Sequence, residues 1–138
     1  MTESDNIEIL TVNLGKLAVT SVYKPPGSTF AYEEPETFSY EHVNVIIGDF
    51  NSHSPSWGYQ ASNEDGDLLE EWAEVHHLDL IHDAKLPPSF NSCRWRRGYN
   101  PDLAFTSDQI TCQCKKQVLE PIPHSQHRPI TIAIFAAV

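Results

Sequence analysis

The sequence predicts an α/β domain, and three observations support this fold class. Short apolar segments of strand length recur along the chain, and the clearest covers residues 43–47. A helical segment, Asn63 to His77, lies between that strand and a further short strand, which is the strand, helix, strand order of α/β folds. The 138 residues are enough to bury one core, so we expect residues 1–138 to form a single domain.

A β-hairpin is predicted at the start, over Ile7 to Tyr23. Two segments of alternating polarity flank the stretch Asn13 to Lys16, which supplies the asparagine and glycine of a tight turn. The Lys-Pro-Pro-Gly sequence at 24–27 ends the second strand, because proline has no backbone donor for the ladder. Residues 28–42 show little periodicity and are predicted as a loop with at most one helical turn.

The predicted central strand is VNVIIGDFN, Val43 to Asn51. Its first five residues are apolar apart from Asn44, which indicates a strand that is buried on both faces. At its end stand Asp49 and Asn51, while Phe50 between them is expected to point into the core. Taken alone, a Gly-Asp-x-Asn sequence is also typical of an ordinary turn.

The predicted helix over Asn63 to His77 begins with Asn63 or Asp65 as its N-cap and has acidic residues in its first turn. Its core face is predicted from apolar residues at helical spacing, namely Leu68, Leu69, Trp72 and Val75. Residues 87–101 follow a double proline and are predicted to be irregular. The remaining strands are predicted at residues 78–81, 102–106, 117–119 and 130–135.

Charge excludes a generally basic surface that coats nucleic acid. Nine lysines and arginines stand against nineteen acids, which gives a net charge of −10. A nucleic-acid partner must therefore be bound through a local patch or through metal ions. No apolar run is long enough for a bilayer and no basic, apolar leader is seen, so we expect no membrane partner and an intracellular location, nuclear or cytoplasmic.

The chain has three cysteines, an odd number, so reduced thiols are expected. The pair Cys112 and Cys114 has a spacing that a metal site could use, but two alternating positions of a strand explain it more simply.

Polar side chains gather at or beside the predicted strand ends. They are Asp49 with Asn51, Asp102, His127, and a basic and aromatic loop over residues 94–99. A carboxylate that orients an imidazole, next to a second carboxylate and an amide, is suited to the attack of water on a phosphodiester. Asp49 would polarise the water or hold a divalent ion, Asn51 would bind a phosphate oxygen, and Asp102 would set the His127 tautomer. Individually, Asp102 could be a turn acid and His127 a surface residue.

Four segments together resemble a known family. They are VNVIIGDFNSHSPSWG from residue 43, NEDGDLLEEW followed by LDLIHD from residue 63, NPDLAFTS from residue 100, and PHSQHRPITI from residue 123. In this order they resemble the endonuclease/exonuclease/phosphatase family, in the branch carried by non-LTR retrotransposons and related to apurinic-site endonucleases. The resemblance extends from about Ala18 to the C-terminus.

The resemblance implies a four-layer α/β sandwich, in which two packed mixed β-sheets are flanked by helices. It also implies Mg²⁺- or Mn²⁺-dependent cleavage of phosphodiesters, with DNA nicked before reverse transcription. Asp49 is similar to the aspartate that activates the nucleophile, and Asn51 to the asparagine that contacts phosphate. Asp102 is similar to the acid paired with the catalytic histidine, and His127 to that histidine.

A DNA-binding segment is implied for the loop SCRWRRGYN, which lies where relatives place a segment against DNA. Its arginines would bind phosphates, and Trp95 is a candidate for stacking on a base. The predicted nucleic-acid-binding residues are Arg94, Trp95, Arg96, Arg97 and Tyr99.

Two departures from the family pattern predict impaired cleavage. Relatives carry Ser-Asp-His where this chain reads Ser-Gln-His, so Gln126 would be a weaker metal ligand beside Asp49. The asparagine and the metal-binding glutamate of the family's front portion have no counterpart here, so we expect a partial sandwich with that portion missing. Ile46, Phe105 or Ile132 would then face water, unless a longer polyprotein or a partner chain completes the sheet.

Two other functions remain open from the sequence. The chain could bind nucleic acid through its arginines without cleaving it, or it could be a decayed remnant of a mobile element.

Overall fold

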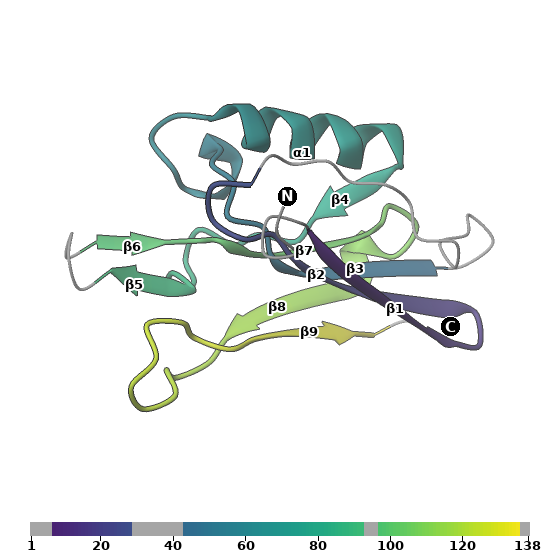
Figure 1. The fold of residues 1–138 in the computed structure, drawn as a ribbon. Helices are drawn as coiled ribbons and strands as arrows, with labels where there is room; N and C mark the ends of the chain where they lie inside the picture. Colours follow the sequence, from purple (N-terminus) through teal and green to yellow (C-terminus); the bar gives the residue numbers. More distant parts are fainter. Residues whose placement is uncertain (1–6, 29–42, 93–96, 136–138) are drawn as a thin grey trace.

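A five-stranded mixed sheet forms the centre of the molecule (Figure 1). The computed structural model describes residues 7–28, 43–92 and 97–135. Strand β2 runs parallel to β3, and the other neighbouring pairs are antiparallel. The predicted loop at 28–42 lies outside the described residues except for Ser28. In spatial order the strands are β1 (Glu8–Leu14), β2 (Leu17–Tyr23), β3 (Val43–Asp49), β7 (Asp102–Ser107) and β4 (Leu78–Leu80).

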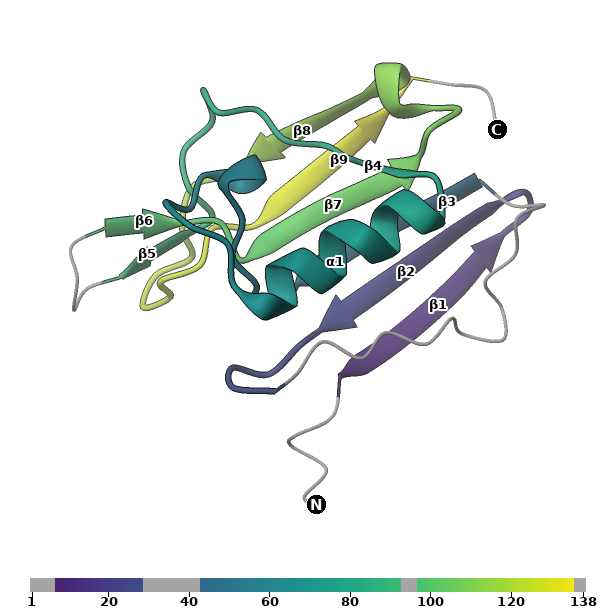
Figure 2. The ribbon, with the colours of Figure 1, turned by 90° about the horizontal axis from the view of Figure 1, so that it is seen from above.

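Two further layers cover the faces of this sheet. Helix α1 (Glu64–Val75) lies on one face, and the antiparallel pair β8 (Cys114–Val118) and β9 (Ile130–Ile134) lies below the other (Figures 1 and 2). The expected α/β class with packed sheets and flanking helix is therefore confirmed. No helix in the part of the chain described here has the length and apolar character needed to cross a bilayer.

The core lies between α1 and the sheet. Leu69 of the helix and Ile46 of β3 are fully buried, and the ring of Phe50 meets that of Phe105 edge to face at 5.7 Å. This arrangement confirms that Phe50 points inward, but it contradicts the expectation that Ile46 or Phe105 faces water. Both belong to the helix-covered face of the sheet.

Helix α1 begins and ends close to the predicted positions. Asn63 is the N-cap, and its side-chain oxygen accepts a hydrogen bond from the backbone N–H of Gly66 at 2.8 Å. Trp72 contributes to the core as expected. Val75, however, which is the last residue of the helix, is 64% exposed.

Residues 87–101 are not irregular throughout. They contain a short hairpin, β5 (Phe90–Ser92) and β6 (Arg97–Tyr99), in which Phe90 pairs with Tyr99. Strand β8 also begins earlier than predicted, at Cys114. Strands β5 and β6 have only three residues each, which is too short for alternation to show in the sequence.

Part of the lower sheet face is exposed. Leu10, Val12 and Leu14 alternate along β1 and are 67%, 50% and 59% exposed. Ile9 of the same strand packs against the helix-covered core, so these alternating residues lie on the face opposite α1. Strands β8 and β9 lie near β7 and away from β1 (Figure 2). Ile132 of β9, which was expected to face water, is half-buried. The exposed apolar strip lies instead on the first hairpin.

Candidate active site

Asp49 and Asp102 face each other across one strand pair. Strands β3 and β7 are antiparallel, and their register places these two residues directly opposite one another. Opposite residues in a sheet project to the same face, so both carboxylates lie together where β3 ends and β7 begins. We call this edge of the sheet the rim. Their side chains are 18% and 17% exposed, which leaves them accessible to a small ligand.

His127 joins the two carboxylates. Its Nδ1 lies 2.9 Å from Oδ2 of Asp102, and its Nε2 lies 4.0 Å from Oδ2 of Asp49. Because a carboxylate accepts, Nδ1–H is the donor, and Nε2 faces the rim. The structure therefore brings together three of the four predicted catalytic side chains, and their candidate ligand atoms all lie within 4.8 Å of one another.

The unpredicted hairpin holds the segment that carries His127. The backbone N–H of Asn91 donates to Gln126 O at 2.9 Å, and the N–H of Arg128 donates to Ser89 O. The ring of Phe90 meets the imidazole of His127 at 4.9 Å in an edge-to-face contact. These contacts fix the imidazole over the end of β7. The sequence signal for them is the alternation of Phe90 and Ser92, which is too short to be distinctive.

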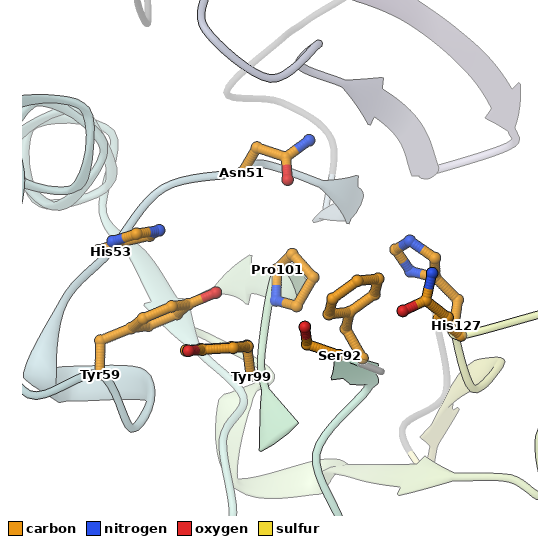
Figure 3. Close-up of a pocket in the computed structure, with 9 residues that line it drawn as sticks. Asn51, His53, Tyr59, Ser92, Tyr99, Pro101 and His127 are labelled. Carbon is orange, nitrogen blue, oxygen red and sulfur yellow. The ribbon is translucent and has the colours of Figure 1, made fainter. Parts of the chain in front are cut away.

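Asn51, the fourth predicted residue, lies at the same rim with a left-handed backbone, φ 40°. Its N–H donates to Oδ1 of Asp49 at 3.2 Å, and its Nδ2 donates to the carbonyl of Lys24 at 2.8 Å. The amide oxygen of Asn51 points toward the pocket in Figure 3. A carbonyl partner can only accept, so this orientation of the amide follows from chemistry.

The carboxyl of Asp49 has a strongly raised pKa. Burial is the main cause that raises its pKa to about 6, and the neighbouring Asp102 raises it further. The His127 imidazole, the N–H of Asn51 and the Lys24 ammonium act in the opposite direction. At neutral pH Asp49 is mostly ionised, with a basicity suited to accepting a proton.

Two hollows meet at His127. The larger, of about 540 Å³, is lined by aromatic and polar side chains, and the smaller, of about 360 Å³, contains both carboxylates. Figure 3 shows the larger pocket between the loop of Asn51 and the segment of His127. The larger pocket is lined by Asn51, His53, Tyr59, Phe90, Ser92, Tyr99, Pro101, Gln126 and His127.

Stacked rings form one wall of the larger pocket. Tyr59 lies between His53, at 4.2 Å between centroids, and Tyr99, at 5.5 Å, with nearly parallel planes in both pairs. The guanidinium of Arg97 lies 5.6 Å from the centroid of the Tyr99 ring. Burial raises the pKa of Tyr59, and the nearby Asp49 raises it further, so the hydroxyl stays protonated as a donor.

The predicted nucleic-acid-binding loop is described in part. Arg97 is exposed and Tyr99 lines the larger pocket. Arg94, Trp95 and Arg96 lie outside the described residues.

Two buried lysines near the rim were not predicted. The Lys24 ammonium forms an ion pair with Asp65 at 3.0 Å, with 1% of the lysine side chain exposed. The Lys116 ammonium donates to Asp102 O at 3.3 Å, and burial lowers its pKa although the Asp102 charge opposes this. In the sequence Lys24 belongs to the predicted strand stop, and only the tertiary fold reveals that both lysines are buried.

The donor set at the rim fits a hard divalent cation. Asp49 and Asp102 offer carboxylate oxygens, and Mg²⁺ commonly binds through one or two carboxylates and retains several waters. The imidazole of His127 is a less suitable ligand, because Mg²⁺ prefers oxygen ligands. Gln126, the predicted weak ligand, lines the larger pocket with Asn51, whereas both aspartates line the smaller one.

Comparison with known proteins places the fold. No curated protein matches the chain significantly. Among solved structures, the endonuclease domain of TRAS1, a telomere-specific non-LTR retrotransposon, matches with a TM-score of 0.62 and 19% sequence identity. The match covers 94% of this chain and 61% of that one, and at this identity it shows a shared fold.

The family follows from the sequence itself. Residues 17–131 match the family described as endonuclease-reverse transcriptase, and this range includes both aspartates, Asn51 and His127. The matched range is well over half of the chain. The protein therefore belongs to the endonuclease-reverse transcriptase family.

Proposed function

We propose that this chain is a DNA endonuclease domain of the non-LTR retrotransposon type, which nicks a phosphodiester with Mg²⁺ or Mn²⁺. The observation that carries the proposal is the 2.9 Å contact from His127 to Asp102 at the rim where Asp49 lies opposite in register. Family membership supports the reaction class.

The side chains at the rim divide the work of hydrolysis. In the metal-free site the pKa of Asp49 is about 6, and its carboxylate accepts a proton from the attacking water. Asp102 orients the His127 ring through Nδ1–H, and in the protonated ring Nε2–H donates to the negative charge that develops on the phosphate. The amide oxygen of Asn51 orients the water from the pocket side, and its second amide hydrogen can still bind a phosphate oxygen. A divalent ion on the two carboxylates would neutralise phosphate charge and acidify a bound water.

Weak metal binding makes this form of the enzyme slow. Two carboxylates with neutral Gln126 nearby supply less negative charge than a site with a third acid. We therefore expect nicking to need millimolar metal. The aromatic pocket beside His127 supports a nucleic-acid substrate, because every base offers a face for stacking.

The exposed strand face supports a larger assembly. Leu10, Val12 and Leu14 form an apolar strip that water contacts in the described structure. We propose that a longer polyprotein or a partner chain covers this strip and completes the second sheet.

Nicking of supercoiled plasmid DNA tests the activity. The wild type should convert plasmid to the open circle with Mg²⁺ or Mn²⁺, and Asp49→Ala and His127→Asn should each lose at least about 100-fold in rate. The matched controls are Asp108→Ala and His77→Asn, since both residues are exposed and away from the rim. His77 has a left-handed backbone that asparagine tolerates.

The outcome is decisive in either direction. Wild-type protein that never nicks at any metal concentration would refute the proposal. Equal nicking by all four variants would assign the activity to a contaminant.

Binding without cleavage is the second candidate function, favoured by the exposed Arg97 and the stacked Tyr99, which need no metal. Binding of labelled DNA in EDTA that weakens as salt rises, together with no nicking, would support it.

A further inference from the structure

Lys24 is a buried cation joined to the loop that carries Asn51. It directly follows β2, and its own N–H donates to Asp49 O at 2.8 Å. Its carbonyl accepts from Nδ2 of Asn51 at 2.8 Å, and its ammonium donates to the carbonyl of Asn51 at 3.4 Å. One residue therefore holds Asn51 by both its side chain and its backbone.

These contacts act on a residue in a costly conformation. A left-handed backbone costs a residue other than glycine about 1 kcal/mol, although asparagine tolerates it better than most. At φ 40°, Asn51 needs the surrounding bonds to keep its amide oxygen directed at the pocket, as Figure 3 shows.

The ammonium of Lys24 is anchored in turn by helix α1. Asp65, in the first turn, lies 3.0 Å from Nζ. The N-cap Asn63 accepts from the N–H of His53 at 3.0 Å, so the helix start also binds the loop just after Asn51. The Lys24 side chain thus links strand, loop and helix at one point.

Packing alone does not require a charge at this position. Methionine has a similar length and would fill the space without the desolvation cost of a buried ammonium. What the ammonium adds is its ion pair with Asp65 and its bond to the Asn51 carbonyl. The same loop includes Asp49, so a change in its conformation would move two rim residues together.

We propose that Lys24, paired with Asp65, is a positioning residue that keeps the Asn51 amide oxygen directed into the pocket, toward the attacking water. Its catalytic consequence rests on the proposed function, whereas the positioning of Asn51 does not.

The Asn51 side-chain amide is observed directly by NMR in metal-free protein. Asn51→Asp assigns its NH₂ resonance, since asparagines elsewhere also have bonded amides. We expect slow hydrogen exchange for this amide in the wild type. Exchange should become at least about tenfold faster in Lys24→Met and stay slow in Lys24→Arg, which retains the cation. Lys16→Met is the matched control, because Lys16 is exposed at the other end of β2.

A double variant covers the case in which Lys24→Met fails to fold. Lys24→Met with Asp65→Leu removes both charges, and an ion pair replaced by apolar residues is often tolerated. The Asn51 amide should exchange fast in this variant too. Slow exchange in a folded variant without the ammonium would overturn the proposal.

Kinetics separate positioning from binding. In the nicking assay, Lys24→Met should lower kcat by about 10- to 100-fold and leave KM and the Kd for DNA in EDTA within about twofold, because the DNA-binding groups remain. Lys24→Arg should recover most of kcat. A loss confined to KM would overturn the catalytic part of the proposal. If the wild type does not nick at all while the amide results hold, the proposed function fails and the positioning role of Lys24 stands.

Discussion

Asp49 is destabilised as an anion by the same features that suit it to accept a proton. It is largely buried and lies opposite Asp102, so the folded protein raises its pKa from 3.8 to about 6. A folded state that binds a proton more tightly than the unfolded chain loses stability as pH rises from the unfolded-state pKa to the folded-state pKa. The metal-free protein therefore loses this contribution between about pH 4 and pH 6.

Asp49→Asn should stabilise the metal-free protein while it removes cleavage. At pH 7.5 the variant should be more stable than the wild type by roughly 2 kcal/mol, and the gap should narrow toward pH 4. Urea unfolding in EDTA at three pH values measures this. Asp108→Asn is the control and should show no such trend. A variant that is less stable than the wild type at pH 7.5 would contradict the assignment.

Elements with many residues or strong turn signals could be predicted from the sequence. The β1 and β2 hairpin, the β3 strand and the N-cap of α1 were all predicted, because alternation, a tight turn and Asn63 are local signals. The β5 and β6 hairpin was missed, since three-residue strands after two prolines leave no periodicity. It is nevertheless the element that positions His127.

Prediction of the candidate site was likewise limited to residues that local sequence patterns or the family resemblance indicate. Asp49, Asn51, Asp102 and His127 could be named because polar residues at strand ends and the family resemblance indicate them. The buried Lys24 could not, because its environment is created by Asp65, which is distant in the chain and comes close only in the folded structure.

The start of α1 approaches the loop of the rim so closely that only glycine fits. A Cβ added at Gly66 would lie 1.8 Å from the carbonyl oxygen of His53. Helix propensity favours alanine by about 1 kcal/mol, but this contact forces the helix and loop apart.

Gly66→Ala should therefore destabilise the protein by about 2 kcal/mol and slow nicking. Chemical denaturation measures the first effect and the plasmid assay the second. Glu71→Ala, at an exposed position of the same helix, should change stability by less than about 0.5 kcal/mol. Unchanged or increased stability of Gly66→Ala would show that the loop at His53 can move away from the helix at no cost in free energy.

At the scale of the molecule, the two faces of the β1 and β2 hairpin differ. Val22 is 2% exposed beneath α1, whereas Leu10 and Val12 on the opposite face are mostly in contact with water. The sequence alternation predicts the hairpin, but it does not reveal which face lacks a cover. That depends on how far β8 and β9 extend below the sheet.

Leu10→Gln combined with Val12→Thr should leave stability within about 0.5 kcal/mol and reduce self-association at high concentration. Sedimentation velocity over a concentration series measures the association. Val22→Thr, on the helix-covered face, should instead cost about 1 to 2 kcal/mol. If the double substitution unfolds the protein, its two positions belong to the core.

The opposition of Asp49 and Asp102 in one ladder also bears on how this lineage changes over generations. Neutralising Asp49 removes its repulsion with Asp102, so this mutation is expected to stabilise the metal-free polypeptide while it removes the proposed proton acceptor. A copy no longer under selection for the proposed cleavage is therefore expected to lose Asp49 early, ahead of residues whose replacement is neutral for stability.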